Sequence, residues 1–129
     1  EYGDIGDLAK YANEVQDEID KSIGKFWKEK KETNGRYIFV YNPRFPTGSV
    51  ISSVISGKVM NKTLIIVEEK GENFQVHARR QDQKENMAVF VKRLVNGLEG
   101  ASGGGHIPAA GAFFMKKDFD KVMERLREI

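Results

Sequence analysis

The residue types with the clearest capacity for chemistry gather in one glycine-rich stretch, residues 100–111. Gly103, Gly104 and Gly105 are consecutive, and His106 follows them directly. Glycine allows positive φ and brings main-chain N–H groups close to a ligand without interference from a Cβ atom. Successive amides of this kind can form a nest that binds an anion. The same composition also fits a flexible linker, although a linker needs neither the histidine nor the small residues 109–111 after it.

Two side chains are candidates to assist an anion site. His106 can donate a hydrogen bond to a phosphate oxygen, and the alternative is a structural histidine. Arg79 carries the planar guanidinium that holds phosphate or carboxylate through two hydrogen bonds, and its alternative is a solvent-facing residue at the end of a strand. Arg80 and Lys84 would extend the positive charge, but charged residues near turns usually lie in solvent.

The first part of the chain has the pattern of an amphipathic helix. Apolar or small residues recur at alternating steps of three and four: Ile5, Leu8, Ala12, Val15, Ile19, Ser22 and Phe26. This spacing predicts a long helix over residues 7–33. Asn34-Gly35 would end it, because glycine adopts the left-handed conformation that closes a last helical turn.

The middle of the chain predicts a βαβ unit followed by a third strand. Residues 36–41 and 63–67 have the composition of buried strands, and the apolar spacing between them favours a helix over residues 48–56. A helical crossover makes the two strands parallel. Residues 74–79 would pair antiparallel to the second strand, with Gln75, His77 and Arg79 on one face and Phe74, Val76 and Ala78 on the other.

The last third of the chain predicts two more helices and a short strand. Asp82 and Glu85 have the spacing of a capping box, and apolar residues follow at helical spacing until Asn96-Gly97: Met87, Phe90, Val91, Leu94 and Val95. Residues 112–115 form a short apolar strand, and Asp118 opens a final amphipathic helix. The predicted fold is α/β, with a small mixed β-sheet flanked by helices and a long N-terminal connecting helix.

Composition narrows the classes of function. The chain has 129 residues, 21 Lys+Arg against 19 Asp+Glu and a net charge of +2, so it forms one domain and any anion site must be local. The absence of cysteine excludes disulfides and thiolate metal sites. Gly57-Lys58 is followed by Val59, which excludes a phosphate-binding P-loop. No apolar run approaches the length of a membrane span, so no membrane partner is expected. The absence of cysteine fits a reducing cytoplasm more easily than an oxidising compartment.

Residues 103–111 resemble the GGGHxxAAG signature of the DHH-associated domain, and all seven defined positions match. This is the C-terminal substrate-binding domain of DHH phosphoesterases, such as RecJ-like exonucleases and oligonucleotide phosphatases of the NrnA type. The order of the predicted elements agrees with that family, in which a long connecting helix precedes a small mixed sheet. The lysine and glutamate content, with no cysteine, would suit a thermophilic member such as an archaeal one.

The resemblance implies a division of labour between two domains. Residues 1–34 would be the connecting helix from a missing catalytic domain, and residues 35–129 the substrate-binding domain. The catalytic metals, usually manganese, would be held by that missing DHH domain. No catalytic residue, metal site or cofactor is therefore expected in this chain, which would be an inactive fragment by itself.

The resemblance also implies which residues hold phosphate. The glycine-rich loop and its histidine carry over to Gly103, Gly104, Gly105 and His106, and the arginine of a Ser-x-Arg strand motif carries over to Arg79. His77 occupies the serine position of that motif, which is a departure from the family pattern. Ser49 is a further candidate contact.

The expected function is the substrate-binding domain of a RecJ-like DHH phosphoesterase or exonuclease, with single-stranded DNA, RNA or short oligonucleotides as partners. One alternative is a domain of a small-nucleotide phosphatase that acts on short oligonucleotides, phosphoadenosine phosphate or cyclic dinucleotides. Another is a noncatalytic nucleic-acid-binding and dimerisation module like the C-terminal domain of alanyl-tRNA synthetases. The N-terminal helix would allow an oligomer.

Overall fold

The computed structural model describes residues 5–129, and the first four residues of the expected connecting helix lie outside that range. The chain forms, in order, α1 (Ile5–Glu29), β1 (Lys31–Thr33), β2 (Arg36–Tyr41), α2 (Gly48–Ser56), β3 (Thr63–Lys70), β4 (Asn73–Arg79), α3 (Met87–Val95), β5 (Ser102–Gly105), β6 (Ala109–Met115), a 3-10 turn (Lys116–Asp118) and α4 (Phe119–Glu128). None of the described helices combines the length and the apolar character needed to cross a bilayer.

The strands of the described chain form one mixed sheet in the order β1-β2-β3-β4-β6-β5. β2 and β3 are parallel, and α2 is the crossover between them, as the sequence predicts. β3 and β4 are antiparallel, which is also confirmed. β6 pairs antiparallel with both β4 and β5, so β5 lies at one edge of the sheet and β1 at the other.

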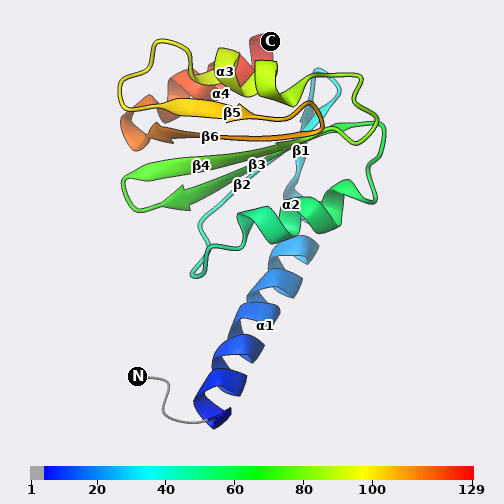
Figure 1. The fold of residues 1–129 in the computed structure, drawn as a ribbon, viewed down its shortest axis with the longest axis vertical. Coiled ribbons are helices and arrows are strands. Elements are labelled where there is room, and N and C mark those ends of the chain that lie inside the picture. Colours follow the sequence, from blue (N-terminus) through cyan, green and yellow to red (C-terminus); the bar gives the residue numbers. More distant parts are fainter. Residues whose placement is uncertain (1–4) are drawn as a thin grey trace.

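Helices cover the two faces of the sheet (Figure 1). One core cluster joins the sheet to α3 and α4, and the other joins it to α1 and α2. β3 lies between both clusters and is buried on both faces, which explains its continuous apolar run. In β4 the alternation predicted from the sequence is confirmed: Phe74, Val76 and Ala78 are buried in the α3–α4 cluster, and the alternate residues are half-buried on the α2 face. The predicted α/β class with helices flanking a small mixed sheet is therefore confirmed.

The first helix is long, as predicted, but it ends at Glu29 and not at residue 33. Residues 31–33 form β1, which pairs antiparallel with β2. Asn34 and Gly35 have φ values of 51° and 73°, the conformation of a tight hairpin turn. The Asn-Gly pair therefore closes a β-hairpin, where the sequence pattern predicts a helix end. Phe26 is fully buried near the C-terminal end of α1, whereas the N-terminal half of the helix extends away from the sheet (Figure 1) and contacts the loop between β2 and α2 through Tyr11 and Phe45.

The predicted capping box of α3 is wrong, although the helix itself is confirmed. α3 begins at Met87, and its N-cap is Asn86, whose side chain accepts a hydrogen bond from the amide of Val89 at 3.2 Å. Asp82 instead binds the guanidinium of Arg80, with 2.6 Å between Nε and Oδ1. Glu85 is paired with the buried Arg36 and accepts from Thr63. The partners of Glu85 lie 49 and 22 positions away in the sequence, and a local spacing pattern cannot reveal them.

Candidate anion-binding site

The glycine-rich stretch is a strand and a tight turn, and not a loop. β5 contains the three glycines, and β6 begins at Ala109, three residues earlier than the sequence predicts. At the turn, the amide of His106 donates to the carbonyl of Ala109 at 2.9 Å, and the reverse bond is 3.3 Å long. The β5–β6 hairpin is therefore closed by main-chain hydrogen bonds.

The tip of this hairpin is also fastened to the rest of the domain. The amide of Arg80 donates to the carbonyl of Pro108, and the amide of Met87 donates to that of Ile107, both at 2.9 Å. These bonds join the tip to the end of β4 and to the start of α3. The flexible-linker interpretation of residues 100–111 does not fit this arrangement.

The hydrogen-bond pattern decides which glycine amides face outward. His106 and Ala109 exchange both hydrogen bonds, so by the alternation of an antiparallel ladder the next such pair is Gly104 with Gly111. The N–H groups of Gly103 and Gly105 then point to the open edge of β5. Successive amides of a strand point in opposite directions, so the predicted nest of consecutive converging amides does not form.

The three glycines have different surroundings. A Cβ atom on Gly105, whose φ is +149°, would lie 2.6 Å from the Cα of Ala110. A Cβ on Gly103 would lie 3.2 Å from the carbonyl oxygen of Val91 in α3, which is tighter than normal packing. A Cβ on Gly104 would meet no atom within 4 Å. Packing within the protein therefore requires glycine at 103 and 105, whereas at 104 the missing Cβ only leaves open space.

That open space belongs to a surface hollow of about 260 Å³ between α2, β4 and the β5–β6 hairpin. Its lining consists of Ser49, Ser52, His77, Ala78, Arg79, Gly104, Gly105, Ala109, Ala110 and Gly111. The fold thus brings Arg79 to the same hollow as two of the motif glycines. Gly103 and His106 do not line it: Gly103 packs beneath α3, and His106 lies exposed at the hairpin tip.

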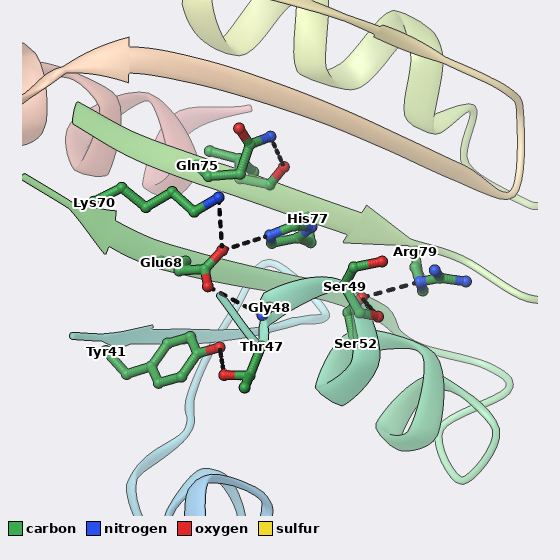
Figure 2. A network of polar contacts seen from close by, with 11 residues as sticks. Tyr41, Thr47, Gly48, Ser49, Ser52, Glu68, Lys70, Gln75, His77 and Arg79 are labelled. Carbon is green, nitrogen blue, oxygen red and sulfur yellow. Dashed lines mark hydrogen bonds and ion pairs between the residues drawn. The ribbon is translucent and has the colours of Figure 1, made fainter. Parts of the chain in front are cut away.

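Arg79 is oriented by α2. Its Nε donates to Oγ of Ser52 at 3.1 Å, and that hydroxyl donates to the carbonyl of Ser49 at 2.9 Å (Figure 2). Within residues 5–129, no group accepts a hydrogen bond from the two terminal nitrogens of Arg79. The guanidinium therefore keeps its paired donors for a ligand. Arg80 and Lys84, the other basic candidates, do not line the hollow.

A buried carboxylate supports the base of the site. Glu68 on β3 is 1% exposed. Its Oε1 lies 3.0 Å from Nε2 of His77, and its Oε2 accepts from the amide of Gly48 at 3.1 Å (Figure 2). Burial opposes ionisation of Glu68, but the hydrogen bonds from His77 and Gly48 outweigh it and hold the pKa of this carboxyl below its ordinary value. Glu68 is therefore ionised at neutral pH.

Sequence reasoning missed Glu68, although a signal was present. Strand alternation places Glu68 on the same face as Leu64 and Ile66, both fully buried. A glutamate on the buried face of a strand needs hydrogen-bond or ion-pair partners. One partner is close because Gly48 has no side chain: a Cβ there would lie 2.4 Å from Nε2 of His77.

The polar side chains that line the hollow are those of two serines, His77 and Arg79. Within residues 5–129, no group of three or more His, Asp or Glu side chains is placed to hold a metal. The Arg79 guanidinium is a hydrogen-bond donor, and a donor of this kind can bind and orient an anion.

Comparison with known proteins identifies the fold. No family model matches the sequence, and no curated protein matches it either. Among solved structures, RecJ from Thermus thermophilus superposes with a TM-score of 0.66 at 18% identity, over 95% of this chain and 19% of RecJ. The pGpG-specific phosphodiesterase PggH from Vibrio cholerae gives 0.59 at 13% identity, over 92% of this chain and 41% of PggH.

A third similar structure is the C-Ala domain of Aquifex aeolicus alanyl-tRNA synthetase. Its TM-score is 0.63 at 15% identity, over 78% of this chain and 96% of that domain. The chain therefore has an α/β fold that is also present in C-Ala and in parts of RecJ and PggH, and it spans about a fifth of the length of RecJ. At the level of the fold, this confirms the resemblance to a DHH-associated domain that residues 103–111 predict.

Proposed function

We propose that this chain is the substrate-binding domain of a DHH-type phosphoesterase, a RecJ-like exonuclease in the first instance. It would bind phosphate groups of single-stranded DNA, RNA or a short oligonucleotide in the hollow between α2 and the β5–β6 hairpin. The observation that carries the proposal is the position of Arg79, whose terminal nitrogens have no partner among the described residues, in one hollow with the bare backbone of Gly104.

The chemistry of the hollow favours an anion. A guanidinium binds phosphate through two parallel charge-assisted hydrogen bonds. The hydroxyl of Ser49, which also lines the hollow, supplies a further donor. None of the described residues that line the hollow is acidic, since Glu68 lies buried behind His77. A phosphate group in the hollow would meet donors without a facing negative charge.

His106 belongs to the proposal as a contact beyond the hollow. It follows Gly105 directly and is exposed, and its ring makes no hydrogen bond with the described part of the chain. Its imidazole is therefore available to a phosphate that extends past the hairpin tip. Gly103 contributes by letting β5 pack closely under α3.

Hydrolysis is assigned to another domain. The manganese ions expected for this kind of enzyme would be held by a DHH domain outside this chain. Residues 1–34 would then connect the two domains, with residues 35–129 as the substrate-binding part. The chain alone should bind an oligonucleotide without cleaving it.

A second candidate function is a domain of a small-nucleotide phosphatase. The similarity to PggH, described as specific for pGpG, covers 92% of this chain. The dependence of binding affinity on oligonucleotide length distinguishes the two candidate functions. An exonuclease domain should bind a homopolymeric dodecanucleotide more tightly than the dinucleotide of the same base, whereas a small-nucleotide domain should bind both equally.

The test is a fluorescence-anisotropy titration of labelled oligonucleotides with the chain and two arginine variants. Arg79→Ala should weaken binding by about 1.5–3 kcal/mol, because it removes charge-assisted hydrogen bonds. Arg93→Ala is the matched control: Arg93 is exposed on α3 and does not line the hollow. Equal affinity of the Arg79→Ala and Arg93→Ala variants would refute the site.

A further inference from the structure

The hollow contains a polar side chain to which the glycine motif gives no role. His77 lies on the same face of β4 as Arg79, and its side chain is 18% exposed. Its Nε2 is held by Glu68, whereas Nδ1 has no hydrogen-bond partner within residues 5–129. This second ring nitrogen is also not sealed from solvent: the side-chain atoms that are buried without a partner in the described chain are on Arg36 and Asp118.

The partner of Nε2 decides what Nδ1 can do. Glu68 is buried and accepts from the amide of Gly48, and an ionised carboxylate can only accept hydrogen bonds. Nε2 of His77 must therefore carry a proton. In a neutral imidazole one nitrogen donates and the other accepts, so the neutral form of His77 presents a lone pair on Nδ1 toward the hollow. A lone pair repels phosphate oxygens and requires a donor on the ligand.

The charged side chains near His77 are one carboxylate and two cations. Glu68 and Lys70 on β3 lie on one side, with 4.0 Å between Lys70 Nζ and Glu68 Oε1, and Arg79 lies two residues along β4. From α2, β5 and β6, the residues that line the hollow are only serine, glycine and alanine. Glu68 is thus the carboxylate that holds the Nε2 proton of His77, and the described residues that line the hollow include no second acidic side chain.

The spacing of residues along β4 sets the distance between Arg79 and His77. Residues i and i+2 of a strand point to the same face about 7 Å apart. A nucleotide whose phosphate lies on Arg79 can therefore place its sugar over His77. A ribose differs from a deoxyribose by its 2′-hydroxyl, the group that lets a protein distinguish RNA from DNA.

We propose that Nδ1 of His77 accepts a hydrogen bond from the 2′-hydroxyl of a ribonucleotide, so that this site prefers RNA to DNA. The inference rests on the proposed function, because Arg79 must first hold a phosphate in the hollow. It assigns His77 as a specificity-determining residue, where the family pattern has a serine. A deoxyribonucleotide would leave the lone pair of Nδ1 without a donor.

The experiment compares ribo- and deoxyribo-oligonucleotides of the same short sequence by anisotropy titration at slightly alkaline pH. The unmodified chain should bind the ribo-oligonucleotide about two- to tenfold more tightly, the range that one neutral hydrogen bond supplies. His77→Gln retains a donor that reaches Glu68 but has no acceptor at the position of Nδ1. This variant should lose the preference, because the affinity for the ribo-oligonucleotide falls more than the affinity for the deoxyribo-oligonucleotide.

His77→Asn is the converse variant. Its amide oxygen occupies the position of Nδ1 but the side chain is too short to reach Glu68, so it should retain ribose preference while lowering the thermal unfolding temperature. The inference is overturned if the unmodified chain binds both oligonucleotides equally tightly, or if His77→Gln weakens both equally, as a phosphate contact would. Failure of the unmodified chain to bind either oligonucleotide would instead overturn the proposed function, and the role of His77 with it.

Discussion

Arg79 and Ser52 come from different elements, yet Nε of Arg79 donates to Oγ of Ser52 at 3.1 Å. Ser52 is fully buried in α2, and its hydroxyl is fixed by donating to the carbonyl of Ser49. A long arginine side chain normally loses conformational entropy when it binds a ligand. Here the serine fixes the orientation of the guanidinium in advance, which lowers that cost.

Substitution of Ser52 tests this pre-orientation. Ser52→Ala removes the acceptor of Arg79 and should weaken oligonucleotide binding by about 1 kcal/mol, less than Arg79→Ala does. Isothermal titration calorimetry measures the difference. Ser56→Ala is the control. Like Ser52, Ser56 donates to a main-chain carbonyl three residues earlier in α2 and accepts from a side chain, that of Gln81. Neither Ser56 nor Gln81 lines the hollow. Equal losses in the two serine variants would show that the effect is a general perturbation of α2.

The motif glycines should separate into structural and binding positions. Gly105→Ala puts a Cβ 2.6 Å from the Cα of Ala110 at a φ of +149°, so it should lower the free energy of unfolding by about 2 kcal/mol or more. Gly104→Ala meets no atom within 4 Å, and its φ is not among the positive values. It should leave stability unchanged or raise it by up to about 1 kcal/mol, yet reduce oligonucleotide affinity by filling the hollow.

Thermal unfolding and anisotropy titrations of the two glycine variants check this prediction. The informative result is the Gly104→Ala chain, which should combine full stability with weakened binding. Undiminished affinity in that variant would mean that the ligand does not approach the backbone at residue 104.

Much of the fold was predictable, because hydrophobic periodicity reports which face of an element is buried. The pattern over residues 36–79 predicts both the parallel pair and the antiparallel strand after it, and the structure confirms both. Errors occurred where one local signal fits two structures. Asn34-Gly35 suits a helix end and a tight hairpin equally well, and pairing of residues 31–33 with β2 decides for the hairpin.

The site was only partly predictable for a related reason. The sequence proposes Arg79 and the glycines as partners, and the structure places Arg79, Gly104 and Gly105 around one hollow. The sequence could not reveal that Gly103–Gly105 form an edge strand. A run of glycines has a low intrinsic preference for strands, and this strand forms only because it pairs with β6. Nor could the sequence reveal the buried bond between Glu68 and His77, which joins residues nine positions apart on paired strands.

Close approach of α2 to the sheet depends on Gly48. Gly48→Ala would place a Cβ 2.4 Å from Nε2 of His77 and 2.7 Å from Oε1 of Glu68. Overpacking of this kind should destabilise the domain by about 1–3 kcal/mol. Gly24→Ala is the matched control, because a Cβ at this position of α1 would meet no atom within 4 Å, and alanine should stabilise that helix by up to about 1 kcal/mol. Urea unfolding followed by circular dichroism compares the two; equal midpoints would contradict the packing at Gly48.

Stability in acid should depend on Glu68. The pKa of Glu68 is lower in the folded chain than in the unfolded chain, because the hydrogen bonds from His77 and Gly48 outweigh the effect of burial. The unfolded chain therefore binds the proton more readily, and the free energy of unfolding falls as the pH decreases. The contribution of Glu68 is fully present above about pH 4.3, the ordinary value for glutamate. It is lost as the pH falls through the lower pKa of the folded state.

Glu68→Gln removes this proton linkage while preserving the size of the side chain. The variant should be less stable than the unmodified chain at pH 7, where the charge-assisted bonds contribute most, and the difference should shrink in strong acid. Glu85, whose pKa is also lowered because the bonds from Arg36 and Thr63 outweigh burial, keeps part of the acid dependence in both chains. Urea unfolding across the acid range measures the slope. A constant difference between the two chains at every pH would mean that Glu68 contributes through packing and not through its charge.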